Sequence, residues 1–276
     1  MNATDITQLY GKHWFSWYDS ASGGVQGIID TCRATGAHGV LVKAADGANK
    51  WAQLAQDGPA IKAAGLLLGA WDYVYPTVSA QAQAQDAASA LEVADYLVLD
   101  AEVEYEVATG AEAATALGAA IRALAPSALI GYTSFGAPKL HPQFPYAAFA
   151  AWTDFVIPQV YWSDFAMSPQ AALDNALAAL SPLHKRIFPA GQAYPQATPA
   201  EIAQFSAACA VRWINATYWW DIQSATPELQ QAVGQTEVYV PQTGKPVPRP
   251  AAAPTYAQGY AAGIAAAIKQ LEAMEK

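Results

Sequence analysis

The feature that most constrains the fold is a regular alternation of short apolar runs with longer helix-forming stretches. Eight apolar runs begin between 26 and 32 residues apart. This interval is typical of parallel β/α units, and eight such units match the size of one closed (β/α)8 barrel. We therefore predict a single α/β barrel over residues 1–240. The eight runs span residues 13–18, 40–44, 66–71, 96–100, 128–133, 155–161, 186–190 and 213–219.

Three of the intervening stretches carry helix start signals. Ser168, Thr198 and Thr226 each precede a proline, and a capping hydroxyl before proline at the first helical position favours a helix start. Thr198 is followed three residues later by Glu201, which is the pattern of a capping box. The sequence therefore predicts helices that begin at these points.

The chain continues beyond the predicted barrel. Residues 241–254 (PQTGKPVPRPAAAP) are proline-rich, which predicts an extended linker. Residues 255–276 place apolar side chains three or four positions apart, as in an amphipathic helix. We expect this C-terminal helix either to pack on the barrel or to contact an assembly partner or another copy of the chain.

Composition limits the classes of partner. The formal net charge is −9, which disfavours a phosphate-binding nucleic-acid surface, and no apolar run is long enough to span a membrane. Residues 1–10 lack the pattern of a signal peptide, so we expect a cytoplasmic protein or one released by lysis, for example with a phage. Cys32 and Cys209 are predicted to be buried thiols, and no metal site or cofactor is implied.

The active site of a (β/α)8 barrel lies at the carboxyl ends of its strands. Every predicted strand ends in polar or aromatic residues. Aromatic rings can stack on the faces of a sugar, while carboxylates and amides bind its hydroxyl groups. We therefore predict a polysaccharide ligand. The predicted substrate-binding residues are Asp19, Lys43, Trp71, Asp72, Tyr132, Gln159, Tyr161, Trp162, Gln192, Trp219 and Asp221.

The fourth run ends in three alternating carboxylates. In an extended strand, Asp100, Glu102 and Glu104 would share one face, with neighbouring backbones about 6.6 Å apart. Side chains could close this gap to about 5 Å, the separation of the two carboxyl groups in a retaining glycosidase. Like charges this close raise at least one pKa, as a general acid requires. Because Glu102 belongs to both adjacent pairs, we predict that it is the general acid.

The segments around this run resemble a known family. Residues 40–47 read VLVKAADG, residues 63–73 read AAGLLLGAWDY, residues 96–102 read YLVLDAE and residues 130–134 read IGYTS. These segments resemble glycoside hydrolase family 25, the lysozyme-type muramidases. The resemblance implies a barrel fold, peptidoglycan as substrate, and Glu102 as the catalytic acid with Asp100 beside it.

The acidic run is also similar to a second family. Asp100-x-Glu102-x-Glu104 resembles the Asp-x-Asp-x-Glu strand of family 18 chitinases, with glutamate at the middle position. Residues 159–162 (QVYW) resemble substrate-binding positions of that family. This resemblance implies that Glu104 is the acid, that the N-acetyl group of the substrate is the nucleophile, and that Glu102 and Tyr161 orient that group.

Three hypotheses follow. The first is a retaining glycoside hydrolase that cleaves a β-linked, N-acetylated sugar polymer, either peptidoglycan or chitin-like. The second is an inactive barrel that binds carbohydrate or serves as a structural part of a phage particle or cell-surface assembly. It is suggested because residues 13–17 (HWFSW) lack the first-strand aspartate of family 25. The third is an enzyme that uses Lys43 to form a Schiff base.

Overall fold

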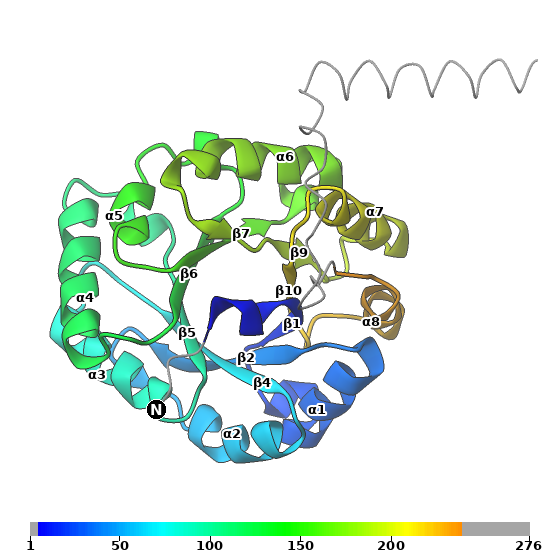
Figure 1. Cartoon of the computed structure of the whole chain (residues 1–276), viewed down its shortest axis with the longest axis horizontal. Coiled ribbons are helices and arrows are strands. Elements are labelled where there is room, and N and C mark those ends of the chain that lie inside the picture. Colours follow the sequence, from blue (N-terminus) through cyan, green and yellow to red (C-terminus); the bar gives the residue numbers. More distant parts are fainter. Residues whose placement is uncertain (1–4, 239–276) are drawn as a thin grey trace, which may run out of the picture. The chain divides into compact units, whose positions relative to one another are not determined.

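The computed structural model describes residues 5–238, and the predicted linker and C-terminal helix lie outside this range. Eight parallel positions close into a ring because β1 pairs with both β2 and β10 (Figure 1). The predicted (β/α)8 barrel is confirmed. Its strands are β1 (Gly11–Ser16), β2 (Gly39–Asp46), β4 (Leu67–Tyr73), β5 (Tyr96–Asp100), β6 (Ile130–Phe135), β7 (Phe155–Val160), β8 (Arg186–Ile187), β9 (Ala190–Gln192) and β10 (Ala216–Trp220).

The seventh position of the ring is built from two short strands. Both β8 and β9 pair in parallel with β7, and residues 188 and 189 separate them. Pro189 lies in this gap, and proline has no amide proton to donate to a neighbouring strand. The interruption therefore follows from the sequence and leaves the ring closed.

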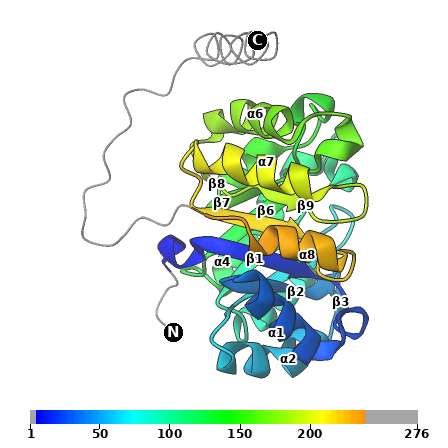
Figure 2. The same ribbon diagram turned by 90° about the vertical axis from the view of Figure 1, so that its right-hand side faces the viewer.

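One additional strand extends the carboxyl end of the barrel. β3 (Asn49–Lys50) pairs antiparallel with the end of β2, and the turn between them contains Gly47 at φ +60°. A side chain at this glycine would also press on the Tyr75 ring, so the tight turn requires glycine. Figure 2 shows this hairpin and residues 6–9 at opposite ends of the barrel.

Helices cover the outside of the ring. Ser168, Thr198 and Thr226 each accept a backbone hydrogen bond at the helix start, and Thr198 and Glu201 form the predicted capping box. The predicted helix starts are therefore confirmed. The helices are α1 (Gly24–Thr35), α2 (Gln53–Ala63), α3 (Ala80–Leu91), α4 (Gly110–Leu124), α5 (Tyr146–Ala150), α6 (Pro169–Leu180), α7 (Pro199–Ala210) and α8 (Pro227–Gly234).

The barrel has an inner and an outer core, because successive side chains of each strand point to opposite faces. The outer core lies between strands and helices and includes Trp14 and Val42. The inner core fills the barrel and includes Phe15, Leu41 and Tyr218. Full burial of each such side chain contributes about 1.5–3 kcal/mol.

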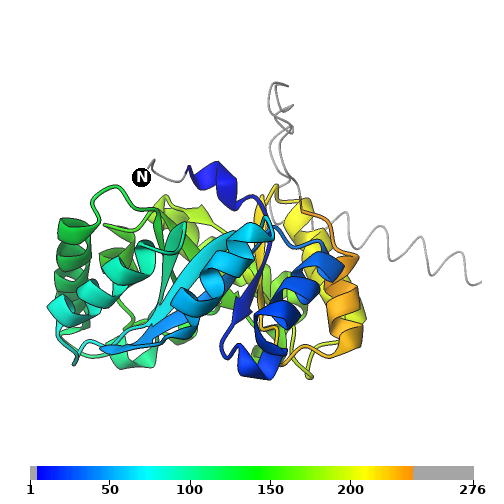
Figure 3. The same ribbon diagram turned by 90° about the horizontal axis from the view of Figure 1, so that it is seen from below.

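A short 3₁₀ helix, η1 (Ile6–Leu9), closes the amino end of the barrel, as Figure 3 shows. Leu9 is fully buried in the inner core. Its carbonyl accepts a hydrogen bond from Nε2 of His13 at 2.8 Å. Within residues 5–238, η1 and its buried Leu9 therefore cover the inner core at this end.

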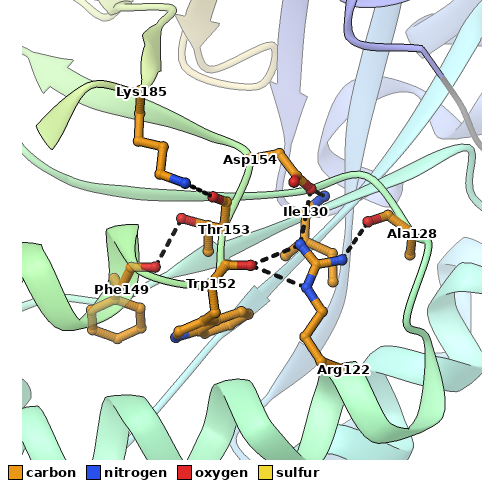
Figure 4. Close-up of polar contacts among 8 residues, drawn as sticks. All are labelled: Arg122, Ala128, Ile130, Phe149, Trp152, Thr153, Asp154 and Lys185. Carbon is orange, nitrogen blue, oxygen red and sulfur yellow. Dashed lines mark hydrogen bonds and ion pairs between the residues drawn. The ribbon is translucent and has the colours of Figure 1, made fainter.

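The loops at the amino end are tied together by a cation network (Figure 4). The Arg122 guanidinium donates to the carbonyl oxygens of Ala128 and Trp152 and to the carboxylate of Asp154. Lys185 donates to the carbonyl of Thr153 at 2.7 Å. A hollow of about 380 Å³ lies among these residues. Because both cations already bind protein oxygens, we assign this end a structural role.

Two further expectations can be compared with the structure. Cys32 and Cys209 are free and buried, which confirms the predicted thiols. Within residues 5–238, no helix is long and apolar enough to cross a bilayer.

Candidate active site

A hollow of about 370 Å³ lies at the carboxyl ends of β5, β7 and β10. A second hollow of about 490 Å³ shares Tyr161, Asp164 and Trp220 with the first. The two therefore form one cleft with a common wall. The first hollow is lined by Asp100, Glu102, Phe135, Gly136, His141, Gln159, Tyr161, Asp164, Phe165 and Trp220.

Two carboxyl groups meet in the first hollow through a shared amide. Gln159 Nε2 donates to Asp100 Oδ1 at 3.2 Å and to Glu102 Oε1 at 2.9 Å. Asp100 is the last residue of β5 and is only 4% exposed, whereas Glu102 is partly exposed. The buried carboxyl group therefore lies behind the accessible one, and Gln159 fixes both.

The electrostatics of the site favour the protonated form of Asp100. Burial raises the pKa of Asp100 well above its usual range, and the charge of Glu102 and a hydrogen bond with it add to the effect. The nearby Lys43 opposes the shift. Burial and the charge of Glu102 therefore favour the neutral, protonated form of Asp100.

Glu104 does not follow the predicted extended pattern. β5 ends at Asp100, and the chain then turns into a 3₁₀ helix, η3 (Val103–Tyr105). Glu104 accepts a hydrogen bond from the Tyr73 hydroxyl at 2.9 Å and is not among the residues that line the hollow. The expectation that three acids share one strand face is therefore wrong beyond Asp100.

Tyr73 was not among the predicted site residues, although it lies close to Asp100, Glu102 and Glu104. It pairs with Asp100 in the β4–β5 register. Burial raises its pKa, and the charges of Glu102, Glu104 and Asp100 raise it further. The signal was present in the sequence, since Tyr73 lies two positions after Trp71 and therefore on the same inner face.

Lys43 lies inside an aromatic box beside the acids. Its side chain is 1% exposed, and Nζ forms an ion pair with Asp46 Oδ2 at 2.7 Å. Nζ also lies 4.6–4.8 Å from the ring centroids of Trp17, Trp51 and Trp71, within the range of cation–π attraction. Lys43 thus organises the aromatic interior of the barrel and has an acidic partner.

Trp220 provides the aromatic wall of both hollows. Its ring lies 5.5 Å from Trp71 and 5.8 Å from Trp17. The predicted residue was Trp219, which precedes Trp220 and whose ring instead packs against Phe205 in the outer core. Alternation from the buried inner residue Tyr218 places Trp220 inside the barrel.

The structure corrects three predicted substrate-binding residues. Tyr132, Trp162 and Trp219 are fully buried in the outer core, between strands and helices. The Tyr132 ring stacks on Phe149, and Trp162 packs on Phe205. A side chain sealed in this layer cannot contact a sugar in the cleft.

Four further predicted residues lie near the cleft without lining it. Asp19 caps a 3₁₀ turn by accepting from the Ser20 amide at 2.7 Å. Asp221 accepts from the Ser224 amide, and burial raises its pKa. Asp72 is buried on the outer face of β4, and Gln192 accepts from the Ser163 amide. The hydrogen bonds give Asp19, Asp221 and Gln192 structural roles, whereas burial keeps Asp72 away from the cleft.

One wall of the first hollow comes from Phe135 at the end of β6 and from His141, neither of which was predicted. The His141 ring stacks on Phe135 with centroids 3.4 Å apart, and its Nδ1 lies 2.6 Å from Glu106 Oε1. Phe135 ends β6 and His141 lies in the connection that follows it, whereas Glu106 comes from the connection after β5, so no sequence spacing indicated the contact between His141 and Glu106. Among residues 5–238, no group of His, Cys, Asp and Glu is suited to hold a metal ion.

No protein-family model and no curated protein matches the chain. Solved structures do resemble it. The catalytic domain of a hyperthermophilic chitinase from Pyrococcus furiosus aligns with a TM-score of 0.60 and 10% identity, over 82% of this chain and 95% of that one.

Two other solved structures share the architecture. A glycoside hydrolase family 5 protein from Bacteroides vulgatus gives a TM-score of 0.53 and 11% identity, over 76% of this chain and 58% of that one. A putative deoxyribose-phosphate aldolase from Toxoplasma gondii gives a TM-score of 0.53 and 14% identity, over 82% of this chain and 93% of that one. At these identities the likeness defines the class as (β/α)8 barrels, which support many chemistries.

Proposed function

We propose that the protein is a glycoside hydrolase that cleaves a β-linked polymer of N-acetylated amino sugars. The observation that carries this proposal is the Asp100–Glu102 pair, which Gln159 holds together in a hollow bordered by Trp220 and Tyr161. A protonated carboxyl group beside aromatic rings can donate to a glycosidic oxygen while the rings stack on the sugar. A chitinase domain with the same fold supports the substrate class.

Glu102 is the general acid in this proposal, because it is the accessible member of the pair. Its proton passes to the glycosidic oxygen as the bond from that oxygen to the anomeric carbon breaks. Asp100 lies beside Glu102 with a raised pKa, and Gln159 holds both carboxyl groups in place.

The second reacting group is the acetamido oxygen of the substrate itself. Glu104 is held by Tyr73 and does not line the hollow, so it is poorly placed to attack. The acetamido oxygen attacks the anomeric carbon as the leaving group departs. Water then adds to that carbon and opens the cyclic intermediate, and the Glu102 carboxylate takes up the released proton.

The test compares Glu102→Gln with the native chain on soluble N-acetylglucosamine oligomers and on peptidoglycan. Loss of the acid is expected to lower kcat by about 10²–10⁴ while leaving the fold unchanged. Glu92→Gln is the matched control, because it removes the same charge from an exposed helix end at the amino side of the barrel. Full activity in Glu102→Gln would remove Glu102 from this role.

The same experiment tests the alternative of a barrel without catalysis. Native protein that binds the oligomers and releases no product over long incubation would contradict the hydrolase proposal. A carbohydrate-binding or structural role would then be the better assignment.

A further inference from the structure

The ionisable side chains that line the cleft are mainly acidic. Asp100, Glu102 and Asp164 line it, whereas no lysine or arginine does so among the residues that the structure describes. The single basic ring in the lining, His141, lies 2.6 Å from the Glu106 carboxylate. No cation in this lining is therefore free to receive a negatively charged sugar.

Asp164 is the carboxylate best placed to meet a substituent on the substrate. It lines both hollows, and its Oδ2 accepts a hydrogen bond from the Tyr194 hydroxyl at 2.8 Å. The backbone beneath it is also fixed, because the fully buried Gln192 accepts from the amide of Ser163. Asp164 is thus an oriented, exposed charge on the common wall of the cleft.

We infer that the cleft selects polymers whose amino sugars carry a free, protonated amine against Asp164, and that it rejects sugars that carry a carboxylate. This inference rests on the proposed function, because it concerns the substrate of the same site. The chemical class is partially deacetylated, glucosamine-containing polymer. A muramic acid residue would bring its lactyl carboxylate into a cleft whose accessible carboxylates are Glu102 and Asp164.

The physical basis is charge complementarity near a low-dielectric wall. An ammonium group that approaches Asp164 gains Coulomb attraction and a charge-assisted hydrogen bond. Asp164 is exposed, so the gain is modest, and a preference of about fivefold is expected. Because such attraction is screened by ions, added salt should reduce it.

Binding is measured by calorimetry on the Glu102→Gln protein, so that turnover does not interfere. Three oligomers of equal length are the probes: N-acetylglucosamine, its partially deacetylated form, and one that alternates N-acetylglucosamine with muramic acid. The pH is kept below the pKa of the sugar amine. We expect the deacetylated oligomer to bind about fivefold more tightly than the acetylated one, and the muramic acid oligomer to bind most weakly.

Adding Asp164→Asn should bring the preference for the deacetylated oligomer close to one, since the amide keeps an acceptor for Tyr194 and loses the charge. Glu92→Gln in the same background should keep the preference. Equal affinity for all three oligomers, no binding of any, or full preference without Asp164 would overturn the inference.

The outcome for the proposed function is read separately from native turnover. Hydrolysis without a charge preference would overturn this inference and leave the hydrolase assignment intact. A charge preference without hydrolysis would support this inference and contradict the hydrolase assignment.

Discussion

Asp72 is a buried carboxyl group whose titration opposes folding at neutral pH. Burial raises its pKa to about 7, with Asp86 adding to the shift and with Lys43 and the Ala45 amide opposing it. The folded chain therefore keeps a proton that the unfolded chain releases near pH 4. The contribution of Asp72 to the free energy of unfolding therefore falls as pH rises from about 4 to 7, by a few kcal/mol at most.

We predict that Asp72→Asn melts at a higher temperature than the native chain at about pH 8, and at a similar temperature near pH 4. The amide has no charge to desolvate and keeps an acceptor for the backbone. Thermal melts across this range provide the measurement, with Glu92→Gln as the control for loss of one surface charge. A lower melting temperature for Asp72→Asn at high pH would contradict the assignment.

His13 changes the free energy of unfolding with pH in the opposite direction to Asp72. Burial lowers its pKa to about 3, with the Leu9 carbonyl opposing the shift and His38 adding to it. The unfolded chain takes up a proton near pH 6.5 that the folded chain refuses, so the stability from neutral His13 is lost as pH falls from about 6.5 to 3. Its Nε2 donates to Leu9, which leaves Nδ1 to accept from Tyr96.

The two groups should nearly cancel in the native chain between about pH 4 and 6.5. We predict that His13→Gln removes the His13 contribution to the pH dependence, so that the free energy of unfolding then falls as pH rises. Asp72→Asn removes the other, so that stability then rises with pH. Denaturant unfolding at several pH values measures both slopes, and parallel curves for the two variants would contradict the prediction.

At the scale of the element, the cap of α7 is a local contribution that can be isolated. Thr198 accepts from the Glu201 amide, and Glu201 accepts from the Thr198 amide. We predict that Thr198→Ala lowers the free energy of unfolding by about 1 kcal/mol, whereas Thr198→Ser retains most of it. Chemical denaturation of the three proteins measures the difference, and equal loss in both variants would show that the hydroxyl is not the cause.

The positions of the strands could be predicted from the sequence better than the direction in which each strand side chain points. The spacing of apolar runs located the strands and the ring because these depend on burial alone. A barrel strand is buried on both faces, so hydrophobicity does not show which side chains point inward. That is why Trp219 was selected in place of Trp220, and Tyr132 was selected although it faces the helices.

The acids and the loops illustrate the same limit. Asp100 and Glu102 could be predicted because they follow an apolar run, and the active site of a (β/α)8 barrel lies at the carboxyl ends of its strands. The turn that moves Glu104 to Tyr73 follows from local backbone geometry that no pattern in this segment indicates. The contact between His141 and Glu106 needs the segments after β5 and β6 to meet in space.

At the scale of the molecule, the barrel closes on itself within the described residues. β1 pairs with β10, and Lys12 Nζ donates to the carbonyls of Val233, Gly234 and Thr236. We predict that deletion of residues 241–276 leaves the melting temperature within a few degrees and the activity on short oligomers unchanged. Scanning calorimetry and turnover measure both, and loss of folding would show that the barrel needs this segment.

The proposed role of residues 241–276 in assembly is tested with the same variant. If the segment contacts a partner or another copy, sedimentation of the shortened chain should reveal a smaller species. An identical sedimentation coefficient, after correction for mass, would argue against that role.

The contact between Lys12 and the end of α8 brings the beginning and the end of the ring within one side chain of each other. A short peptide could therefore join the two, and the chain could be opened elsewhere on the amino face without breaking the ring. Such a circular permutant would keep the cleft intact and would show that the order of the units along the chain is not needed to build it.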